Sequence, residues 1–174
     1  MSYIKIFAAA MIAGAVIAGC DNQHPSERLD VADTDSLADC PAIAFVRPTP
    51  TSTPEVTVKM NGVPIQMLWD TGATGSTIST LELLNLAKAE KISEEDHLYN
   101  SSATVADGST VIVPVYVIKE LVLTTTKGKE FTVHNVTVSV MDNLGASALL
   151  GQNVMKELPE YTFDDEENVI RFKQ

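Results

Sequence analysis

Three observations predict an all-β domain with one or two short helices. Segments rich in Val, Ile and Thr recur through most of the chain after residue 55, and this composition favours strands. Turn dipeptides such as Asn61-Gly62 and Asp107-Gly108 separate these segments, as they do in β-hairpins. Helical patterns are confined to the stretch 79–90 and to a short piece that Pro159 ends.

Length and composition limit the architecture and the partners. With 174 residues, 45% of them hydrophobic and 6% aromatic, the chain has the size and composition of one globular domain. Its 23 Asp and Glu residues outnumber its 12 Lys and Arg residues, which gives a formal net charge of -11. Because phosphate binding requires a basic face, nucleic acid is not an expected partner.

Residues 1–19 have the features of a signal peptide. One positive charge, Lys5, precedes an apolar stretch that is shorter than a membrane-spanning helix. The stretch ends in Ile17-Ala18-Gly19-Cys20, which resembles a bacterial lipobox, so acyl chains on Cys20 would anchor the mature protein in a bilayer. The alternative is an ordinary secretory signal with an incidental cysteine. Asp21 resembles an inner-membrane retention signal, which predicts a lipid-anchored protein of the bacterial cell envelope, on the periplasmic face of the inner membrane.

The expected domains after the signal peptide are a lipidated cysteine with its tether, 20–54, and a folded domain, 55–174. The polar composition of 21–39 predicts disorder, and the prolines of 48–54 predict a stiff, exposed spacer that is also a candidate for self-cleavage. Between them, 42–46 is either a short strand or a docking segment. Cys40 is the one cysteine left after the anchor, and we expect an inert thiol; the alternative is a disulfide between two chains.

The predicted strands follow one another in short hairpins. Residues 55–60 alternate with period two, Asn61-Gly62 supplies a tight turn, and 63–69 returns as a more apolar strand. Ser79-Thr80-Leu81-Glu82 has the form of a capping box and begins the first helix. An exposed loop is expected at 91–97, and further strands at 99–106, 109–117, 121–126, 131–140, 161–164 and 168–172, the last two forming a hairpin that closes the sheet.

The strand 63–69 runs directly into Asp70-Thr71-Gly72, which is the candidate functional site. A carboxylate at the point where a buried strand meets a turn costs free energy unless it is paired. Such an acid is therefore more often functional than structural. The alternative is a plain turn in which Gly72 adopts a positive φ and Asp70 caps a backbone amide.

Asp70-Thr71-Gly72-Ala73 resembles the active-site loop of aspartic proteases, and of the retropepsin-like branch in particular. Two further segments follow in the family's order. The hairpin with Ala106, Asp107 and Gly108 at its tip matches the flap. Leu150-Gly151-Gln152-Asn153 is similar to the apolar strand that lies beside the catalytic loop and leads into a short helix. The resemblance covers 55–172, favours bacterial enzymes of the gag-polyprotein type, and implies a closed β-barrel equivalent to one half of a two-lobed pepsin.

The resemblance also implies a reaction. Aspartic proteases hydrolyse peptide bonds of a polypeptide with two carboxylates that share one proton, and they use no metal or cofactor. The chain has no second Asp-Thr-Gly or Asp-Ser-Gly, so the dyad would join the Asp70 residues of two chains in a symmetric homodimer. Thr71 would hydrogen-bond across the dimer axis, and Gly72 would offer its amide to the acid.

Three positions depart from other members of the family. Ala73 stands where many pepsin-like enzymes have a Ser or Thr whose hydroxyl stabilises the ionised carboxylate. Without that hydroxyl the shared proton should be held to higher pH, which predicts an optimum in mild acid. In viral enzymes an acid and an Arg at two of these positions usually form an ion pair. This chain has Thr74 and Gln152 there, so it lacks both members of the pair.

Two other functions remain as alternatives to a membrane-anchored, homodimeric aspartic endopeptidase. One is a non-catalytic lipoprotein on the same fold, a peptide-binding or assembly module in which Asp70 is a buried, hydrogen-bonded acid. The other is a structural envelope lipoprotein of an unrelated β fold, which predicts no dimer.

Overall fold

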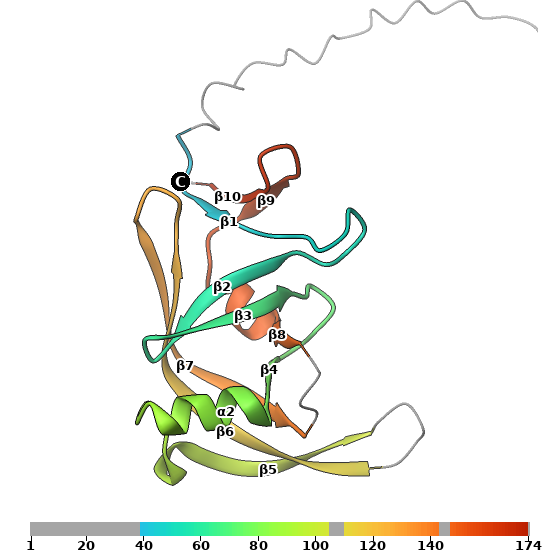
Figure 1. Ribbon diagram of the computed structural model, residues 1–174, viewed down its shortest axis with the longest axis vertical. Coiled ribbons are helices and arrows are strands. Elements are labelled where there is room, and N and C mark those ends of the chain that lie inside the picture. Colours follow the sequence, from blue (N-terminus) through green and yellow to red (C-terminus); the bar gives the residue numbers. More distant parts are fainter. Residues whose placement is uncertain (1–38, 105–109, 143–146, 174) are drawn as a thin grey trace, which may run out of the picture. The chain divides into compact units, whose positions relative to one another are not determined.

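The computed structural model describes residues 39–104, 110–142 and 147–173 (Figure 1). Most of these residues lie in strands, so the predicted all-β fold class is confirmed. In chain order the elements are β1 (Ala42–Ala44), β2 (Glu55–Met60), β3 (Val63–Trp69), β4 (Ser76–Ser79), α2 (Thr80–Lys88), the 3-10 helix η1 (Glu94–Asp96), β5 (His97–Thr104), β6 (Thr110–Thr124), β7 (Glu130–Met141), β8 (Ala148–Leu150), α3 (Gln152–Met155), β9 (Tyr161–Asp164) and β10 (Val169–Phe172).

Strands β2, β3, β8, β4, β7 and β6 close into a barrel. They pair in that order, and β6 pairs again with β2 through Lys59↔Val122 and Met60↔Leu121. β5 lies outside the ring, paired with β6. Period-two alternation fills the interior: Val56, Val58 and Met60 of β2 are each at most 1% exposed. This rigid barrel is the scaffold that carries the loop after β3.

The first hairpin brings the chain to Asp70. β2 and β3 pair antiparallel along their whole length. The turn residues Asn61 and Gly62 have φ of 47° and 87°, a left-handed pair that Asn and Gly adopt at low cost. The predicted strands 55–60 and 63–69 and the turn between them are confirmed.

Helix α2 begins with the predicted capping box. Ser79 Oγ accepts a hydrogen bond from Leu81 N at 3.1 Å, and the Glu82 carboxylate accepts one from Ser79 N at 2.7 Å. Leu86 is the buried residue of the helix. The later helix, α3, begins at Gln152, with Gly151 between it and β8, so Gln152 and Asn153, which were expected in the strand, lie in the helix.

The strands predicted at 109–117 and 121–126 are one continuous strand, β6. The division was wrong because Lys119 and Glu120, both exposed, are part of the strand and not of a loop. Glu120 is bonded to the first hairpin turn, since its N–H donates to Asn61 Oδ1 at 3.0 Å. A strand of this length pairs with β2, β5 and β7, and so closes the barrel.

The ordered domain begins before Glu55, so the boundary expected there is wrong. β1 pairs antiparallel with β10, and Val46 forms a bridge with Glu55. The segment 42–46 is therefore part of the fold, and the first of its two predicted alternatives, a short strand, is the correct one. Sequence alone gave too few residues here to reveal a strand whose partner lies at the other end of the chain.

The segment 48–54 is a folded loop and not the spacer that its prolines predicted. Ser52 N donates to Thr49 O at 3.0 Å, which closes a turn. The Arg47 guanidinium donates to Ser52 O at 2.6 Å and to Asp165 Oδ1 at 2.8 Å. The loop is thus fastened both to itself and to the turn between β9 and β10.

The hairpin of β9 and β10 does not close the barrel sheet, which corrects that prediction. The two strands form a separate three-stranded sheet in the order β1-β10-β9. In Figure 1 this sheet and the β5–β6 hairpin lie at opposite ends of the described domain. The prediction failed because the partner of β10 is β1, a strand that the sequence did not reveal with certainty.

The stretch 91–97, expected as an exposed loop, contains two buried residues, Ile92 and Asp96. The Asp96 carboxylate accepts hydrogen bonds from Ser93 N at 2.9 Å and from Lys119 Nζ at 3.0 Å. The bond from Lys119 and the bond from the Ser93 backbone together lower the pKa of Asp96 below its ordinary value of 3.8.

Replacing Asp96 by Asn is expected to lower the melting temperature at pH 7, because the ionised carboxylate is bonded in the folded chain. A carboxyl whose pKa is lowered by folding stabilises the fold above its unfolded pKa and loses that effect as the pH falls through its folded pKa. The difference between the two proteins should therefore shrink below about pH 4. Thermal melts from pH 7 to pH 3 measure it, with Glu95→Gln at an exposed neighbour as control. A difference in melting temperature that stays the same from pH 7 to pH 3 would contradict this role of the ionised Asp96.

Several predicted features lie outside the described residues. They are the signal peptide 1–19, the anchor Cys20 with Asp21, and the flap tip of Ala106, Asp107 and Gly108. Within 39–104, 110–142 and 147–173, no helix has the length and hydrophobicity needed to cross a membrane.

Candidate active site

Asp70 lies where β3 leaves the barrel. Its N–H donates to Leu150 O of β8 at 3.0 Å, which continues the parallel pairing of β3 and β8. Its side chain is partly buried, and Oδ1 accepts a hydrogen bond from Gly72 N at 2.9 Å. The carboxylate is therefore held in one orientation by its own loop, at the end of a rigid strand.

The loop after Asp70 is fastened to the segment after β8. Gln152 Nε2 donates to Thr71 O at 2.9 Å, and Gln152 N donates to Ala73 O at 2.9 Å. Asn153 N donates to Thr74 O at 3.2 Å. The structure thus brings together the two sequence segments that were singled out as the loop and its neighbouring strand. Gln152 therefore holds the loop by hydrogen bonds at the position where viral enzymes usually have an Arg in an ion pair.

Gly151 lies where the backbone after β8 comes close to the backbone of the Asp70 loop, and a glycine leaves room for this approach. A Cβ built on Gly151 would lie 2.5 Å from Gly75 C and 3.0 Å from Ala73 O, and neither backbone atom can move alone. Ser76, buried beneath this contact, accepts from Gly151 N at 3.0 Å and donates to Asn153 Oδ1 at 2.8 Å. Gly75 was not identified from the sequence, and neither was the contact of Ser76 with Gly151, because nothing local indicates a contact between residues 75 positions apart.

Of the two features that the plain-turn alternative predicts for this loop, one is found and the other is not. Asp70 does cap a backbone amide, that of Gly72. The positive φ expected for Gly72 is absent, since among the described glycines only Gly62 and Gly128 have one. A Cβ at Gly72 would instead lie 3.3 Å from Asp70 Oδ1, so glycine keeps space around the carboxylate.

Asp70 opens into a pocket of about 320 Å³ that the sequence did not predict. The residues that line it are Arg47, Thr51, Ser52, Thr53, Pro54, Trp69, Asp70, Thr71 and Phe163. Asp70 is the one carboxylate among these lining residues. The 47–54 loop and β9 build two of its walls, and Pro54 O accepts from Trp69 N at 2.8 Å. The pocket is polar, with hydroxyls on one wall and an aromatic ring on another.

Trp69 packs directly beneath this surface. Its ring lies edge-on to Tyr161, with centroids 5.0 Å apart, and edge-on to Phe163 at 6.5 Å. The side chain is 2% exposed, and its Nε1–H has no hydrogen-bond partner within the described part of the chain. As the one tryptophan of the sequence, Trp69 reports by fluorescence on the residue beside it, Asp70.

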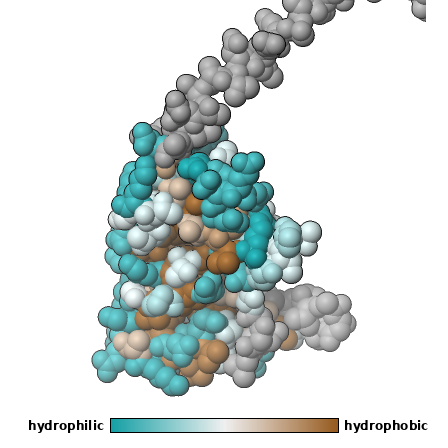
Figure 2. Space-filling view, turned by 45° about the horizontal axis from the view of Figure 1, so that its top comes forward, coloured by the Kyte–Doolittle hydropathy of each residue, from teal (hydrophilic) through white to brown (hydrophobic). Residues whose placement is uncertain are grey.

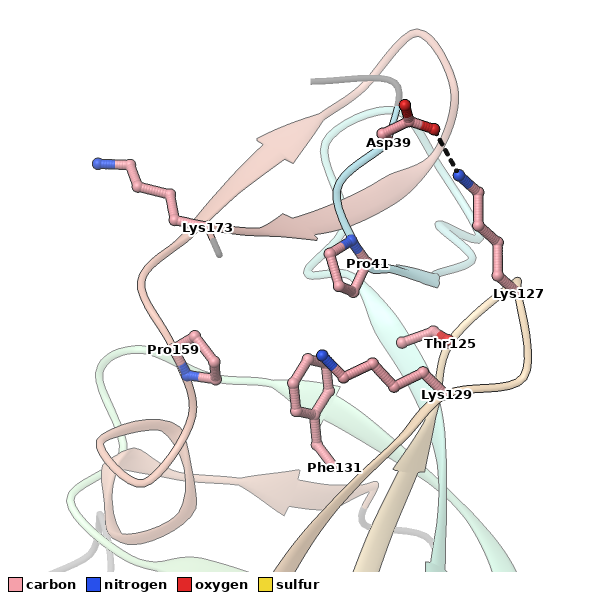
Figure 3. Close-up of a pocket in the computed structure, with 8 residues that line it drawn as sticks. All are labelled: Asp39, Pro41, Thr125, Lys127, Lys129, Phe131, Pro159 and Lys173. Carbon is pink, nitrogen blue, oxygen red and sulfur yellow. Dashed lines mark hydrogen bonds and ion pairs between the residues drawn. The ribbon is translucent and has the colours of Figure 1, made fainter. Parts of the chain in front are cut away.

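A larger pocket, of about 610 Å³, lies elsewhere (Figure 3). Figure 3 shows Asp39 paired with Lys127 at 3.2 Å, and the Lys129 ammonium lies 5.5 Å from the centre of the Phe131 ring. None of the predicted site residues lines this pocket. Its size alone therefore gives it no part in the chemistry of Asp70.

Comparisons with known proteins agree with this geometry. A family model described as "gag-polyprotein putative aspartyl protease" matches residues 56–157, more than half of the chain. The chain is similar to the crystal structure of a retropepsin-like aspartic protease from Rickettsia conorii, with a TM-score of 0.52 and 19% identity, over 74% of this chain and 95% of that one. At that identity the likeness shows the fold, and the predicted retropepsin-like fold is confirmed. No curated protein matches the chain.

Proposed function

Because the chain belongs to the gag-polyprotein aspartyl protease family, we propose that it is an aspartic endopeptidase whose dyad joins Asp70 of two identical chains. One observation carries the proposal. The Asp70-Thr71-Gly72 loop is fixed at the end of a barrel strand by the Gly151–Asn153 segment, and its carboxylate is oriented by Gly72 N. Such preorganisation is what a catalytic acid requires and what a merely structural turn does not.

The mechanism follows from two carboxylates sharing one proton. Like charges at hydrogen-bond distance cannot both ionise, so one Asp70 stays ionised and the other stays protonated. The ionised carboxylate removes a proton from water, which attacks the peptide carbonyl, while the protonated one donates a hydrogen bond to the carbonyl oxygen. The tetrahedral intermediate then collapses with cleavage of the peptide C–N bond, and the leaving amine takes up the proton that the dyad removed from water. No covalent intermediate with the protein forms. In each chain the hydrogen bond from Gly72 N to Asp70 Oδ1 would keep the carboxylate in its orientation.

We also propose that acylated Cys20 anchors the enzyme at the bacterial cell envelope, with Asp21 directing it to the inner membrane. If the tether predicted from the sequence behaves as a flexible coil from 21 to 38, it would hold the domain roughly 25 Å from the bilayer. Substrates would then be polypeptides close to the membrane surface. Labelling with a radioactive fatty acid tests the anchor: Cys20→Ala should abolish the label and release the protein from the membrane fraction.

Cleavage of a mixed peptide library between pH 4 and 7 tests the enzyme function. The chain from Asp33 onward forms one compact unit that contains every strand of the described residues, and it is the form to use. Activity per chain should rise with protein concentration in step with the dimer mass measured in the same buffer. Full activity in a stable monomer would contradict the shared dyad, and a stable dimer without cleavage would favour the non-catalytic binding module.

The pH–rate profile is expected to peak in mild acid. The methyl group of Ala73 cannot donate a hydrogen bond to the dyad, so the shared proton is held to higher pH than in enzymes with a hydroxyl there. Ala73→Ser should move the acidic limb of the profile to lower pH. An optimum below pH 3 for the wild-type protein would contradict the role given to Ala73.

A further inference from the structure

The pocket of about 610 Å³ in Figure 3 combines an apolar floor with several ammonium groups. The apolar residues that line it are Pro41, Phe131 and Pro159, and the basic ones are Lys127, Lys129 and Lys173. Figure 3 shows Lys129 extended over the Phe131 ring, while Lys127 and Lys173 lie on either side of Pro41. This lysine pocket therefore offers both hydrophobic surface and positive charge to a ligand.

Positive charge is in excess at the lysine pocket, although the chain as a whole is acidic. The formal net charge is -11, yet three of the 12 Lys and Arg residues line this one pocket. Asp39 is the one carboxylate among the lining residues. Glu160 pairs with Lys173 at 2.7 Å and still leaves the lysines in the majority. An anionic partner is therefore attracted to this face of the domain and repelled by the acidic remainder.

The lysines can exchange their present partners for an external anion. Lys127 pairs with Asp39 at 3.2 Å. In this pair, as in that of Lys173 with Glu160, both side chains are more than half exposed. Exposed ion pairs of this kind contribute little free energy. The Lys129 ammonium lies 5.5 Å from the centre of the Phe131 ring, a cation–π contact that leaves its N–H groups able to donate to an anion.

The lysine pocket also lies where the proposed tether joins the domain. The described residues begin at Asp39, which lines the pocket, so the stretch 21–38 would attach at this face. β1 and β10 belong to this end of the domain, and α2 and the β5–β6 hairpin lie at the other end (Figure 1). Figure 2, in which the β1 end is turned forward, shows a mostly teal surface there with brown patches between. An anchor on Cys20 would raise the concentration of bilayer headgroups at this face.

We propose that the lysine pocket docks on an anionic phospholipid bilayer. The ammonium groups bind headgroup phosphates, and the apolar floor covers the ester-linked part of the lipid beneath them. The inference rests on the proposed anchor and names the surface that the domain turns toward the membrane. A small soluble anion would use the lysines but not the apolar floor. The β5–β6 hairpin, at the other end of the domain, then points away from the bilayer.

Vesicle co-sedimentation tests the docking with the chain from Asp33 onward, which has no Cys20 and hence no anchor of its own. It should bind vesicles of equal parts phosphatidylglycerol and phosphatidylcholine at low salt, and not vesicles of phosphatidylcholine alone. Lys129→Gln should weaken binding about fivefold, and Lys129→Arg should preserve it. Lys88→Gln is the matched control, because Lys88 is an exposed lysine of α2, at the other end of the domain.

A fluorescent label tests the orientation without removing a lysine. Thr126 and Asn85 are both exposed, so Thr126→Cys and Asn85→Cys, each in a Cys40→Ser background, can carry an environment-sensitive dye. On the anionic vesicles the emission should shift to the blue at position 126 and stay unchanged at position 85. Equal shifts at both positions, or a shift at position 85 alone, would overturn the proposed docking face.

Three other outcomes would overturn the docking. They are no binding to the anionic vesicles, equal weakening by Lys88→Gln and Lys129→Gln, and displacement by millimolar glycerol phosphate, which would identify a site for a soluble anion. Peptide cleavage should be unchanged in these variants, because none of the three lysines lines the pocket of Asp70. Failure of docking with cleavage and fatty-acid labelling intact would leave the proposed function standing. Absence of the label from the wild-type chain would overturn the anchor whatever the vesicles show.

Discussion

Asp70→Asn should lose peptide cleavage by roughly 10²- to 10⁴-fold or more, the range expected for removing a general acid–base group. The amide cannot take a proton from water or share one with a second carboxylate. Its oxygen can still accept the hydrogen bond from Gly72 N, so the free energy of unfolding should change by less than about 1 kcal/mol. Peptide cleavage and a denaturant melt on the same sample measure both quantities.

The matched control for this substitution is Asp142→Asn. Asp142 is exposed, and its one described contact is a long 3.4 Å bond from Thr80 Oγ1. The same change in charge should therefore leave both activity and stability near wild type. If Asp70→Asn still cleaves peptides, the mechanism is contradicted. If the wild type does not cleave and both proteins bind peptide equally, the result favours the alternative in which Asp70 is a hydrogen-bonded structural acid.

Gly151→Ala should reduce both stability and activity, because the new methyl group meets backbone that cannot withdraw. It would lie 2.5 Å from Gly75 C, and the Asp70 loop must shift to make room. Overpacking of this kind typically costs about 1–3 kcal/mol of unfolding free energy. The shift also moves the carbonyls that Gln152 and Asn153 bind, and a displacement of about 1 Å can cost 10²-fold in rate.

Gly75→Ala is the control on the other side of the same contact. A Cβ on Gly75 meets nothing within 4 Å, and its φ is not in the left-handed region. We expect wild-type activity and a stability unchanged or slightly raised, since alanine restricts the unfolded chain more than glycine does. Equal unfolding free energies for Gly151→Ala and the wild type would contradict the close approach of the two loops.

Features encoded by short stretches of sequence were predictable. Asn61-Gly62 specified the first hairpin, Ser79 and Glu82 specified the start of α2, and period-two alternation in 55–60 identified a barrel strand. Each of these depends on backbone preferences and hydrogen bonds within a few residues. The likeness of 70–73 and 150–153 to two family segments also predicted that they lie side by side, as they do.

Features that depend on distant pairing were not predictable. Ala42–Ala44 is too short for a periodic pattern, and its partner β10 lies near the other end of the chain. The walls that Phe163 and the 47–54 loop add to the pocket of Asp70 also come from segments that are distant from Asp70 in the sequence, so they were not predictable either. The predicted strands 109–117 and 121–126 left 118–120 unassigned, yet Lys119 and Glu120 lie at exposed positions of the one long strand β6, where charged side chains are tolerated.

Mixing wild-type and Asp70→Asn chains tests the shared dyad most directly. If each active site needs one Asp70 from each chain, an equal mixture that has exchanged subunits contains about one quarter wild-type dimers. At constant total protein, activity should then fall to about one quarter of the all-wild-type value. A fall to about one half would mean that each chain works alone, and it would contradict the dyad built from two copies of Asp70.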